Sequence, residues 1–369
     1  MGNIPTPLRD AAGRIDLRSL DRAGLRGLVA GILPELEPTK IEAVALRIYK
    51  EVWQHGIVEI EQMETVRRAL RERLAQRAYV ATLSELRRID SVDGAQKFLW
   101  RLHDGAVVES VLIPDGDRVT LCMSSQVGCA MGCTFCLTGD LGLIRHLHPG
   151  EIASQPLQVQ ASLPAGVRIT NLVLMGMGEP VHNLGNLITA LRVCLDDHAL
   201  NYSHRRITVS TVGLVPQLGA LAAALPVNLA VSLNATTEAQ RARIMPITKR
   251  YSMSELLEAC RCVPLPPGKR ITFEYVMFEG FNDTLDDAER LRLLLREIPT
   301  KINLIPYNEN PDRPRLRRPS AEVVKAFQHH LVSRGVSCSI RTTRGIDISA
   351  ACGQLGKGAL EAGGGAAGS

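Results

Sequence analysis

The 369-residue sequence predicts an α/β fold, a partial or complete (β/α) barrel that follows a small helical domain and a linker β-hairpin. Three patterns predict it: helical periodicity from Leu17 to about Ile89, a hairpin signal at Asp104-Gly105, and β-rich runs alternating with amphipathic helical runs from Val119 onward. The expected ranges are 1–93 for the helical accessory domain, 94–118 for the linker hairpin, 119–355 for the barrel and 356–369 for a flexible tail.

Composition excludes several classes of protein. With 45% hydrophobic and 22% charged residues, the chain can bury a large core. No apolar run approaches the ~18 residues that span a bilayer, and the polar start "MGNIPTPLRDAAGR" lacks the apolar core of a signal peptide. We therefore expect a cytoplasmic protein with no membrane partner. The net charge of +5 permits a polyanionic partner without requiring one.

The N-terminal elements are predicted from local pattern. Apolar residues recur at three- and four-residue spacing in "KIEAVALRIYKEVW" and "METVRRALRERLAQ", which is typical of amphipathic helices. Two β-rich runs then flank Asp104-Gly105 in "QKFLWRLHDGAVVESVLIP". Both turn positions tolerate positive φ, so this stretch predicts a two-stranded hairpin.

The barrel is predicted by repeated βα units. The strand candidates are "VTLCMSS", "ITNLVLMGMG", "RRITVSTVG", "VNLAVSLNA", "RITFEYVMFEG", "KINLIPYN" and "SCSIRTTR". The helix candidates between them are "NLITALRVCLDD", "QLGALAAAL", "SMSELLEACRCV", "TLDDAERLRLLLREI" and "SAEVVKAFQHHLVSRG". Such repeats indicate a parallel sheet with helices outside, in which the chemistry lies at the carboxyl ends of the strands. The tail "LEAGGGAAGS" predicts no regular structure.

Nine cysteines are an odd number with no regular disulfide framework, so they indicate thiolate chemistry. Three of them, Cys129, Cys133 and Cys136, lie in the loop "GCAMGCTFC" directly after the first barrel strand. A structural zinc site closes with four protein ligands, and no second Cys/His pair follows at a conventional spacing. An iron–sulfur cluster held by three thiolates fits better, since one iron then stays open to an exogenous ligand. Zinc remains the alternative.

Polar groups end several of the later strands. In "GMGEP" the glycines allow close backbone approach, and Glu179 can accept hydrogen bonds from an ammonium group. A simple turn is the alternative reading of this motif. The residues that we expect to converge on one ligand in the barrel mouth are Gly178, Glu179, Ser210, Ser232, Leu233, Asn234 and Asn308. Taken singly, each polar residue is as well explained as a strand-end cap.

The spacing CxxxCxxC after the first strand of a βα barrel resembles the signature of the radical S-adenosylmethionine superfamily. Longer stretches from Val107 to Leu355 resemble one family closely, the RlmN/Cfr family of radical S-adenosylmethionine RNA methyltransferases. The matching stretches are "VVESVLIPDGDRVTLCMSSQVGCAMGCTFCLTG", "NLVLMGMGEPVHN", "ITVSTVGLVPQL", "LAVSLNA", "RIMPITKRY", "INLIPYN" and "TTRGIDISAACGQL". The helical N-terminal region also resembles the accessory domain of that family. The resemblance implies a barrel of the radical S-adenosylmethionine type with a [4Fe-4S] cluster on Cys129, Cys133 and Cys136.

The resemblance also implies roles for two more cysteines. Cys352 takes a methyl group from one S-adenosylmethionine and becomes S-methylcysteine. A second S-adenosylmethionine, the second of two per turnover, yields a radical that removes hydrogen from this methyl group, and the methylene radical adds to adenine. Cys122 then forms a disulfide with Cys352, which releases the methylated base, and external thiols reduce the disulfide. An unreactive buried thiol is the alternative for both, and it is our expectation for the unmatched cysteines, which are Cys194, Cys260, Cys262 and Cys338.

Glu109 lies on a strand face that it shares with Val107, Val111 and Ile113. A carboxylate among apolar residues can indicate a solvent-exposed edge of a sheet. The resemblance instead implies that Glu109 is the general base that takes the proton from the attacked carbon.

The implied substrate is carbon 2 of an adenosine in 23S ribosomal RNA, and also in transfer RNA, with an electron donor such as flavodoxin. Two basic runs, "RRALRERLAQR" and "RPRLRRP", are candidates for phosphate contacts or for solvated surface. The chain departs from the family at Asn234, where histidine is usual, at "YN" in place of "WN", and in "DLGLIRHLHPGE". Carbon 8 of adenine, another RNA and a non-catalytic iron–sulfur RNA-binding protein therefore stay open as alternatives. Oligomeric state has no signal in the sequence.

Overall fold

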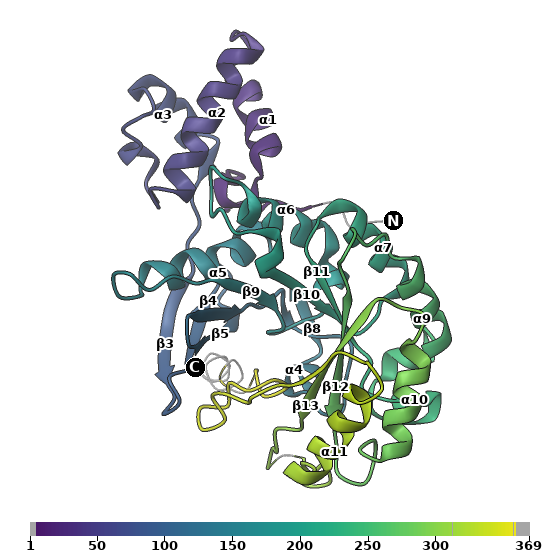
Figure 1. Ribbon diagram of the computed structural model, residues 1–369. Helices are drawn as coiled ribbons and strands as arrows, with labels where there is room; N and C mark the ends of the chain where they lie inside the picture. The colour runs from purple at the N-terminus through teal and green to yellow at the C-terminus, as the bar shows by residue number, and fades with distance from the viewer. Residues whose placement is uncertain (1–4, 312, 357, 359–369) are drawn as a thin grey trace.

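The computed structural model describes residues 5–311, 313–356 and 358 and is centred on one ten-stranded sheet (Figure 1). The strand order is β14-β13-β12-β11-β10-β9-β6-β5-β4-β3. The parallel strands are β6 (Arg118–Cys122), β9 (Asn171–Leu174), β10 (Ile207–Thr211), β11 (Asn228–Ser232), β12 (Ile271–Met277), β13 (Thr300–Pro306) and β14 (Cys338–Ile340). The predicted α/β barrel is confirmed in its partial form, because the order runs openly from β14 to β3.

Helices cover the outer face of the parallel strands (Figure 1). They are α5 (Pro149–Ala161), α6 (Leu184–Leu195), α7 (Val215–Ala224), α8 (Glu238–Ile244), α9 (Met253–Cys262), α10 (Leu285–Leu295) and α11 (Ala321–Val332). Their starts follow ordinary capping chemistry: Ser252 and Thr284, for example, each form a capping box with the acidic residue three positions later. Each predicted strand and helix of the barrel has its element in the structure. Helix α5 was not predicted, and Pro156 inside it obscures the helical pattern.

The N-terminal region contains α1 (Arg22–Ile32), α2 (Pro38–Trp53) and α3 (Arg68–Ala75). The expectation of helical structure as far as Ile89 is wrong, because Ser84–Asp90 forms strand β3. The charged residues of this segment matched the pattern of a solvent-exposed helix. In the structure, however, β3 pairs antiparallel with β4 (Gln96–Arg101) at the edge of the sheet. Long-range strand pairing has overridden the local pattern here.

The predicted hairpin consists of β4 and β5 (Val107–Asp115), and Gly105 in its turn has φ 84°. It is more than a two-stranded linker, because β5 also pairs antiparallel with β6, the first barrel strand. The turn is held to the start of α5 by Arg145, which bonds Asp104 at 2.6 Å and Glu151 at 2.7 Å. The hairpin therefore extends the barrel sheet as one continuous surface.

Residues 341–356, which we call the strap, follow β14 and cross the open side of the barrel (Figure 1). At its outer end, the Gly345 amide donates to Asp93 at 2.8 Å, in the turn between β3 and β4. At its inner end, Gly353 and Leu355 accept hydrogen bonds from Leu137 and Thr138 at 2.8 and 2.7 Å. The strap thus joins the hairpin to the loop that carries the three clustered cysteines. The tail predicted at 356–369 lies outside the described residues except for Gly356 and Gly358.

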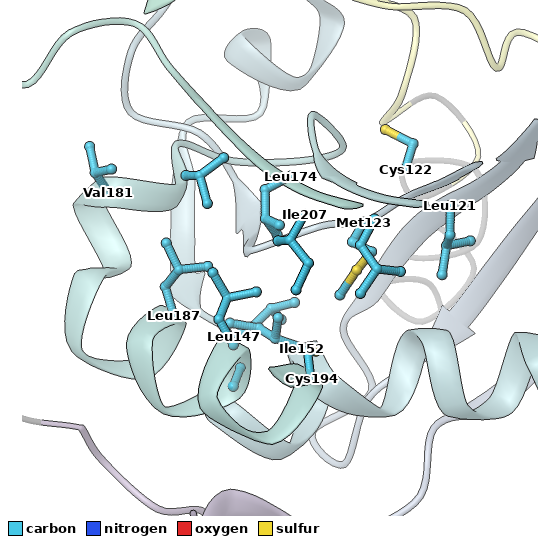
Figure 2. Close-up of a cluster of buried hydrophobic side chains, with 14 of the residues drawn as sticks. Leu121, Cys122, Met123, Leu147, Ile152, Leu174, Val181, Leu187, Cys194 and Ile207 are labelled. Atoms are coloured by element: carbon cyan, nitrogen blue, oxygen red, sulfur yellow. The ribbon is translucent and has the colours of Figure 1, made fainter. Parts of the chain in front are cut away.

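The apolar core fills the space between the sheet and its helices. Figure 2 shows Leu121 and Met123 among the side chains packed against α5 and α6, whereas Cys122 points to the other side of β6, toward the strap. Cys194 lies in this core and burial raises the pKa of its thiol to about 12, in keeping with an inert cysteine. No helix in the described part of the chain is both long and apolar enough to cross a bilayer.

Candidate active site

The three clustered cysteines lie in a loop between β7 (Gln126–Gly128) and α4 (Leu137–Asp140). The Cys129 amide donates to Gly142 O at 2.7 Å, which closes the loop on itself. Gly128 has φ 73°, and a Cβ there would lie 1.9 Å from the Gly142 oxygen. A glycine is therefore required at this position for the loop to form.

All three sulfur-bearing side chains line one cavity of about 140 Å³. Burial raises the pKa of Cys129 to about 12 and raises those of Cys133 and Cys136 as well. The thiols therefore stay neutral near pH 7 unless a bound cation stabilises the thiolates, which is what a metal cofactor provides. Within the described residues, no group of His, Cys, Asp or Glu side chains is arranged to hold a metal ion. The donor set instead fits an iron–sulfur cluster, in which each of three thiolates would hold a different iron.

Most of the predicted strand-end residues line this same cavity. They are Gly178, Glu179, Ser210, Ser232 and Asn234, and Cys352 joins them from the strap. Leu233 does not line it; its buried side chain packs in the core while its carbonyl accepts from Arg241. Residues far apart in the sequence thus converge on the space beside the cysteine loop.

Glu179 is buried and its carboxylate accepts hydrogen bonds from two backbone amides. One oxygen accepts from Val212 at 2.9 Å and the other from Val181 at 3.3 Å. Burial raises the pKa of Glu179 to about 7, although these bonds oppose the effect. The carboxylate therefore holds the loop after β10 in place as well as facing the cavity.

Ser210 and Ser232 converge on Glu274, which was not predicted. Their hydroxyls donate to the same Glu274 oxygen at 2.6 and 3.3 Å. The available signal was a carboxylate within the apolar run "ITFEYVM" of β12. Asn234 has φ 59°, and its side-chain oxygen accepts from the Val276 amide at 2.9 Å. Asparagine tolerates this left-handed conformation, so the residue shapes the strand end.

A second, larger cavity of about 420 Å³, which we call the lumen, fills the interior of the open barrel beneath the strap. Cys122, Cys352 and Asn308 line it, and the Asn308 amide donates to Cys352 O at 3.2 Å. Asn308 does not line the cysteine cavity, so it lies apart from the other predicted cofactor-binding residues. The residues that line both cavities are Met175, Glu274, Ile305 and Cys352. Cys352 therefore lies in the wall between the two spaces.

A half-buried cation, Arg341, lines the lumen together with Cys122 and Cys352 and was also not predicted. The charge of Cys352 is the main reason that the pKa of Arg341 is raised, and Cys122 adds to the effect. Burial, and then the charge of Cys352, raise the pKa of Cys122 to about 12. The guanidinium and the two cysteines are therefore close enough to influence one another. The signal in the sequence was an arginine directly after the last strand run.

Glu109 is completely buried and lines neither cavity in the described structure. Its Oε1 accepts a hydrogen bond from the Gly356 amide at 3.3 Å, and its Oε2 lies 3.7 Å from Lys97 Nζ. A Cβ on Gly358 would come within 3.0 Å of Oε1. The end of the strap therefore covers the predicted base. The alternative that Glu109 lies at a solvent-exposed edge of the sheet is wrong, because the sheet continues from β5 through β4 and β3.

The basic loop after Asn308 is tied to the cysteine loop. Arg313 bonds both oxygens of Asp140, at 2.6 and 2.7 Å, and donates to Cys136 O at 3.3 Å. Its guanidinium is therefore already engaged in supporting the loop of the three cysteines.

Comparisons with known proteins agree with this geometry. A family model described as the radical SAM superfamily matches residues 123–295. The dual-specificity RNA methyltransferase RlmN of Anaeromyxobacter sp. (strain Fw109-5) is 50% identical over 348 residues, which cover 93% of this chain and 90% of that protein. The protein of the same name from Geobacter sulfurreducens is 51% identical over 318 residues, covering 86% and 87%.

A solved structure shows the same fold. The crystal structure of a radical SAM methyltransferase from Sphaerobacter thermophilus has a TM-score of 0.83 and 39% identity, covering 92% of this chain and 98% of that one. The similarity extends through the helical region, the hairpin and the barrel, since nearly the whole of each chain is matched. The chain belongs to the RlmN family of radical S-adenosylmethionine RNA methyltransferases.

Proposed function

We propose that this protein methylates carbon 2 of an adenosine in 23S ribosomal RNA, and in transfer RNA, by way of an S-methylcysteine and a transient protein–RNA adduct. The observation that carries the proposal is the place of Cys352 in the wall between two cavities. One cavity holds the three clustered cysteines and the other holds Cys122. A residue that receives a methyl group on one side and delivers it on the other needs this position.

Cys129, Cys133 and Cys136 would hold the [4Fe-4S] cluster. When bound, the cluster supplies the electron that cleaves S-adenosylmethionine reductively. Glu179, Ser210, Ser232 and Asn234 line the space beside these cysteines and present the polar atoms that would orient the methionine end of this substrate.

Cys352 would act first as a nucleophile. Its thiolate displaces the methyl group of one S-adenosylmethionine, which forms the new S–CH₃ bond and releases the uncharged thioether. Arg341 lines the same lumen as Cys352 and places a positive charge close enough to interact with it. Hydrogen is then removed from the S-methyl group with a second S-adenosylmethionine, and the resulting carbon radical adds to adenine.

Cys122 and Glu109 would complete the turnover. The radical adduct must give up one electron, for which the cluster would be the acceptor, and Glu109 accepts the proton from the attacked carbon, so that the aromatic ring is restored. The Cys122 thiolate then attacks the Cys352 sulfur and a disulfide forms; the bond from sulfur to the methylene carbon breaks, and that carbon takes up a proton as the methylated base leaves. Because the strap covers Glu109 in the described structure, its end must move for the base to be reached. Two electrons from an external thiol pair then restore both cysteines.

Two features support particular alternatives. The name of the relatives, dual-specificity RNA methyltransferase, supports two classes of RNA substrate. The departures at Asn234 and Tyr307 keep carbon 8 of adenine in consideration, since both residues lie at strand ends on the site side. A non-catalytic RNA-binding role is disfavoured, because binding needs neither Cys122 nor Cys352. An RNA substrate and a donor such as reduced flavodoxin are consistent with a cytoplasmic location.

The test is mass spectrometry of nucleosides from ribosomal and transfer RNA of cells with and without the gene. We expect 2-methyladenosine to disappear from both RNA classes when the gene is deleted, and to return with the parent gene. Loss of 8-methyladenosine instead would assign the other carbon. Unchanged methyladenosines in both RNA classes would contradict the proposal.

A further inference from the structure

The lumen does not end at the cysteines, and it continues to the amino-terminal rim of the barrel. Along β6, Arg118, Thr120 and Cys122 all line it, in the alternation expected of one strand face. The first and last of these are four residues apart, or about 13 Å along a strand. Lys301 and Asn303 make the matching row on β13. The lumen is thus a passage with Cys122 at its inner end.

Several small or polar side chains in its walls help to leave the passage hollow. Bulky branched side chains normally fill the interior of a (β/α) barrel. The residues that line this lumen include Thr120, Thr208, Ala230, Thr272 and Ser339, beside larger side chains such as Val173 and Ile302. The resulting volume of about 420 Å³ lies in the range of sites for small ligands.

One end of the passage is open to solvent. Arg118, Lys301 and Ser339 at the rim are exposed, whereas Cys122 has 5% of its surface exposed. All four residues line the same cavity. Cys122 is therefore reached from the amino-terminal rim, on the side of the barrel away from the cysteine loop.

The rim is rich in positive charge. Exposed basic residues in the loops and strand starts there are Arg118, Arg168, Arg205, Arg206, Arg270 and Lys301. Carboxylates of the same rim include Asp115, which lies 3.9 Å from Arg344, Glu297, which lies 3.4 Å from Arg261, and the exposed Asp117, but the exposed basic residues are more numerous. Such an arrangement attracts a polyanion by its phosphates.

We propose that RNA docks on this basic rim and that the target nucleotide enters the lumen from it. The adenine then reaches Cys352 and Cys122 from the side opposite the cysteine loop, while the phosphates stay at the rim. The proposal rests on the proposed function, because it takes RNA as the substrate. It places RNA away from the basic loop after Asn308, where Arg313 is engaged with Asp140.

The first test compares two pairs of charge-neutralising substitutions that change net charge equally. Arg118→Gln with Lys301→Gln removes two cations of the rim, and Arg315→Gln with Arg318→Gln removes two exposed cations of the basic loop. We expect the rim pair to weaken binding of a substrate RNA hairpin about tenfold or more. It should also lower the slope of log Kd against log salt by about one for each lost phosphate contact. The loop pair should have the smaller effect on both. The opposite ranking would overturn the proposal.

The second test blocks the passage without removing charge. Ser339→Trp places a large side chain at an exposed position of the rim. We expect the variant to take up a methyl group on Cys352 normally, measured by protein mass without RNA, and to lose at least tenfold in RNA methylation. Normal methyl uptake shows that the variant has folded. Full RNA methylation in a single turnover would overturn the proposal, and slowing confined to later turnovers would assign the passage to the reducing thiol instead.

The proposed function and the docking of RNA on the basic rim can be disproved separately. If the parent protein binds and methylates no RNA, the proposed function is wrong and this inference falls with it. If the parent methylates RNA while the rim pair and Ser339→Trp behave like the parent, the inference alone is wrong.

Discussion

Lys97 Nζ lies 3.7 Å from Glu109 Oε2, and both side chains are almost completely buried. The two residues come from neighbouring antiparallel strands, β4 and β5. Lys97 also donates to Ser349 O in the strap at 3.3 Å. The lysine therefore connects the proposed base to the segment that carries Cys352, and offsets part of the cost of burying a carboxylate.

Removal of this lysine should destabilise the protein strongly. Lys97→Met leaves the Glu109 charge buried without this partner, so we expect the free energy of unfolding to fall by about 3–5 kcal/mol. Glu109→Gln in the same chain should restore part of the loss, because the buried charge is then gone. Urea unfolding of both single variants and the double variant measures the coupling. Strict additivity would show that the two residues do not interact.

The link between hairpin and α5 should make stability depend on pH. Burial raises the pKa of Glu151, but hydrogen bonds from His103 and Arg145 outweigh it and hold that pKa at about 2, below the ordinary 4.5. The unfolded chain therefore takes up this proton at higher pH than the folded chain. We expect a loss on the order of 3 kcal/mol as the pH falls from about 5 to 2. The urea midpoint of Glu151→Gln should change less with pH over this range than the midpoint of the parent protein. Equal changes in the two proteins would contradict the role given to Glu151.

Arg341 should govern methyl uptake by Cys352. Arg341→Leu removes the cation that interacts with Cys352, so we expect methyl uptake to slow about tenfold, equivalent to roughly 1.4 kcal/mol. Arg341→Lys keeps the positive charge and should retain more of the rate. Protein mass spectrometry follows the methyl group directly. Equal rates for Arg341→Lys and Arg341→Leu would show that the charge of Arg341 does not govern methyl uptake.

The cysteine loop should bind iron. The parent, purified without oxygen, should be brown with about four irons per chain. Replacing Cys129, Cys133 or Cys136 with Ala should abolish iron binding, whereas Cys262→Ala on the exposed face of α9 should keep it. Elemental analysis checks both results, and zinc in place of iron would restore the alternative of a structural zinc site.

Much of the barrel could be predicted because its signals are local. Apolar strand runs such as "VNLAVSLNA" and amphipathic helices such as "SMSELLEACRCV" lie where the pattern put them. Strand β3 could not be predicted, since its pairing with β4 is a long-range property of an edge strand with charged side chains. Helix α5 was hidden by Pro156.

The site residues that belong to a sequence motif could be predicted. The residues that reach the site only through the packing of the folded chain could not. The clustered cysteines and "GMGEP" follow strands, so their meeting in one cavity could be expected. Glu274 and Arg341 carry no motif of their own, and their importance comes from the groups that surround them in the folded chain. The lumen is likewise a property of several small side chains together, which no single stretch of sequence specifies.

The central claim is that Cys352 carries the methyl group and Cys122 resolves the adduct. Cys122→Ala should still load the methyl group and attack adenine, and should therefore stay covalently attached to RNA. Cys352→Ala should keep its iron but carry no RNA. Purification under denaturing conditions, followed by nuclease digestion and mass spectrometry, should find a nucleotide on Cys122→Ala and none on Cys352→Ala. The reverse pattern, or no adduct on either variant of an active parent enzyme, would contradict the account.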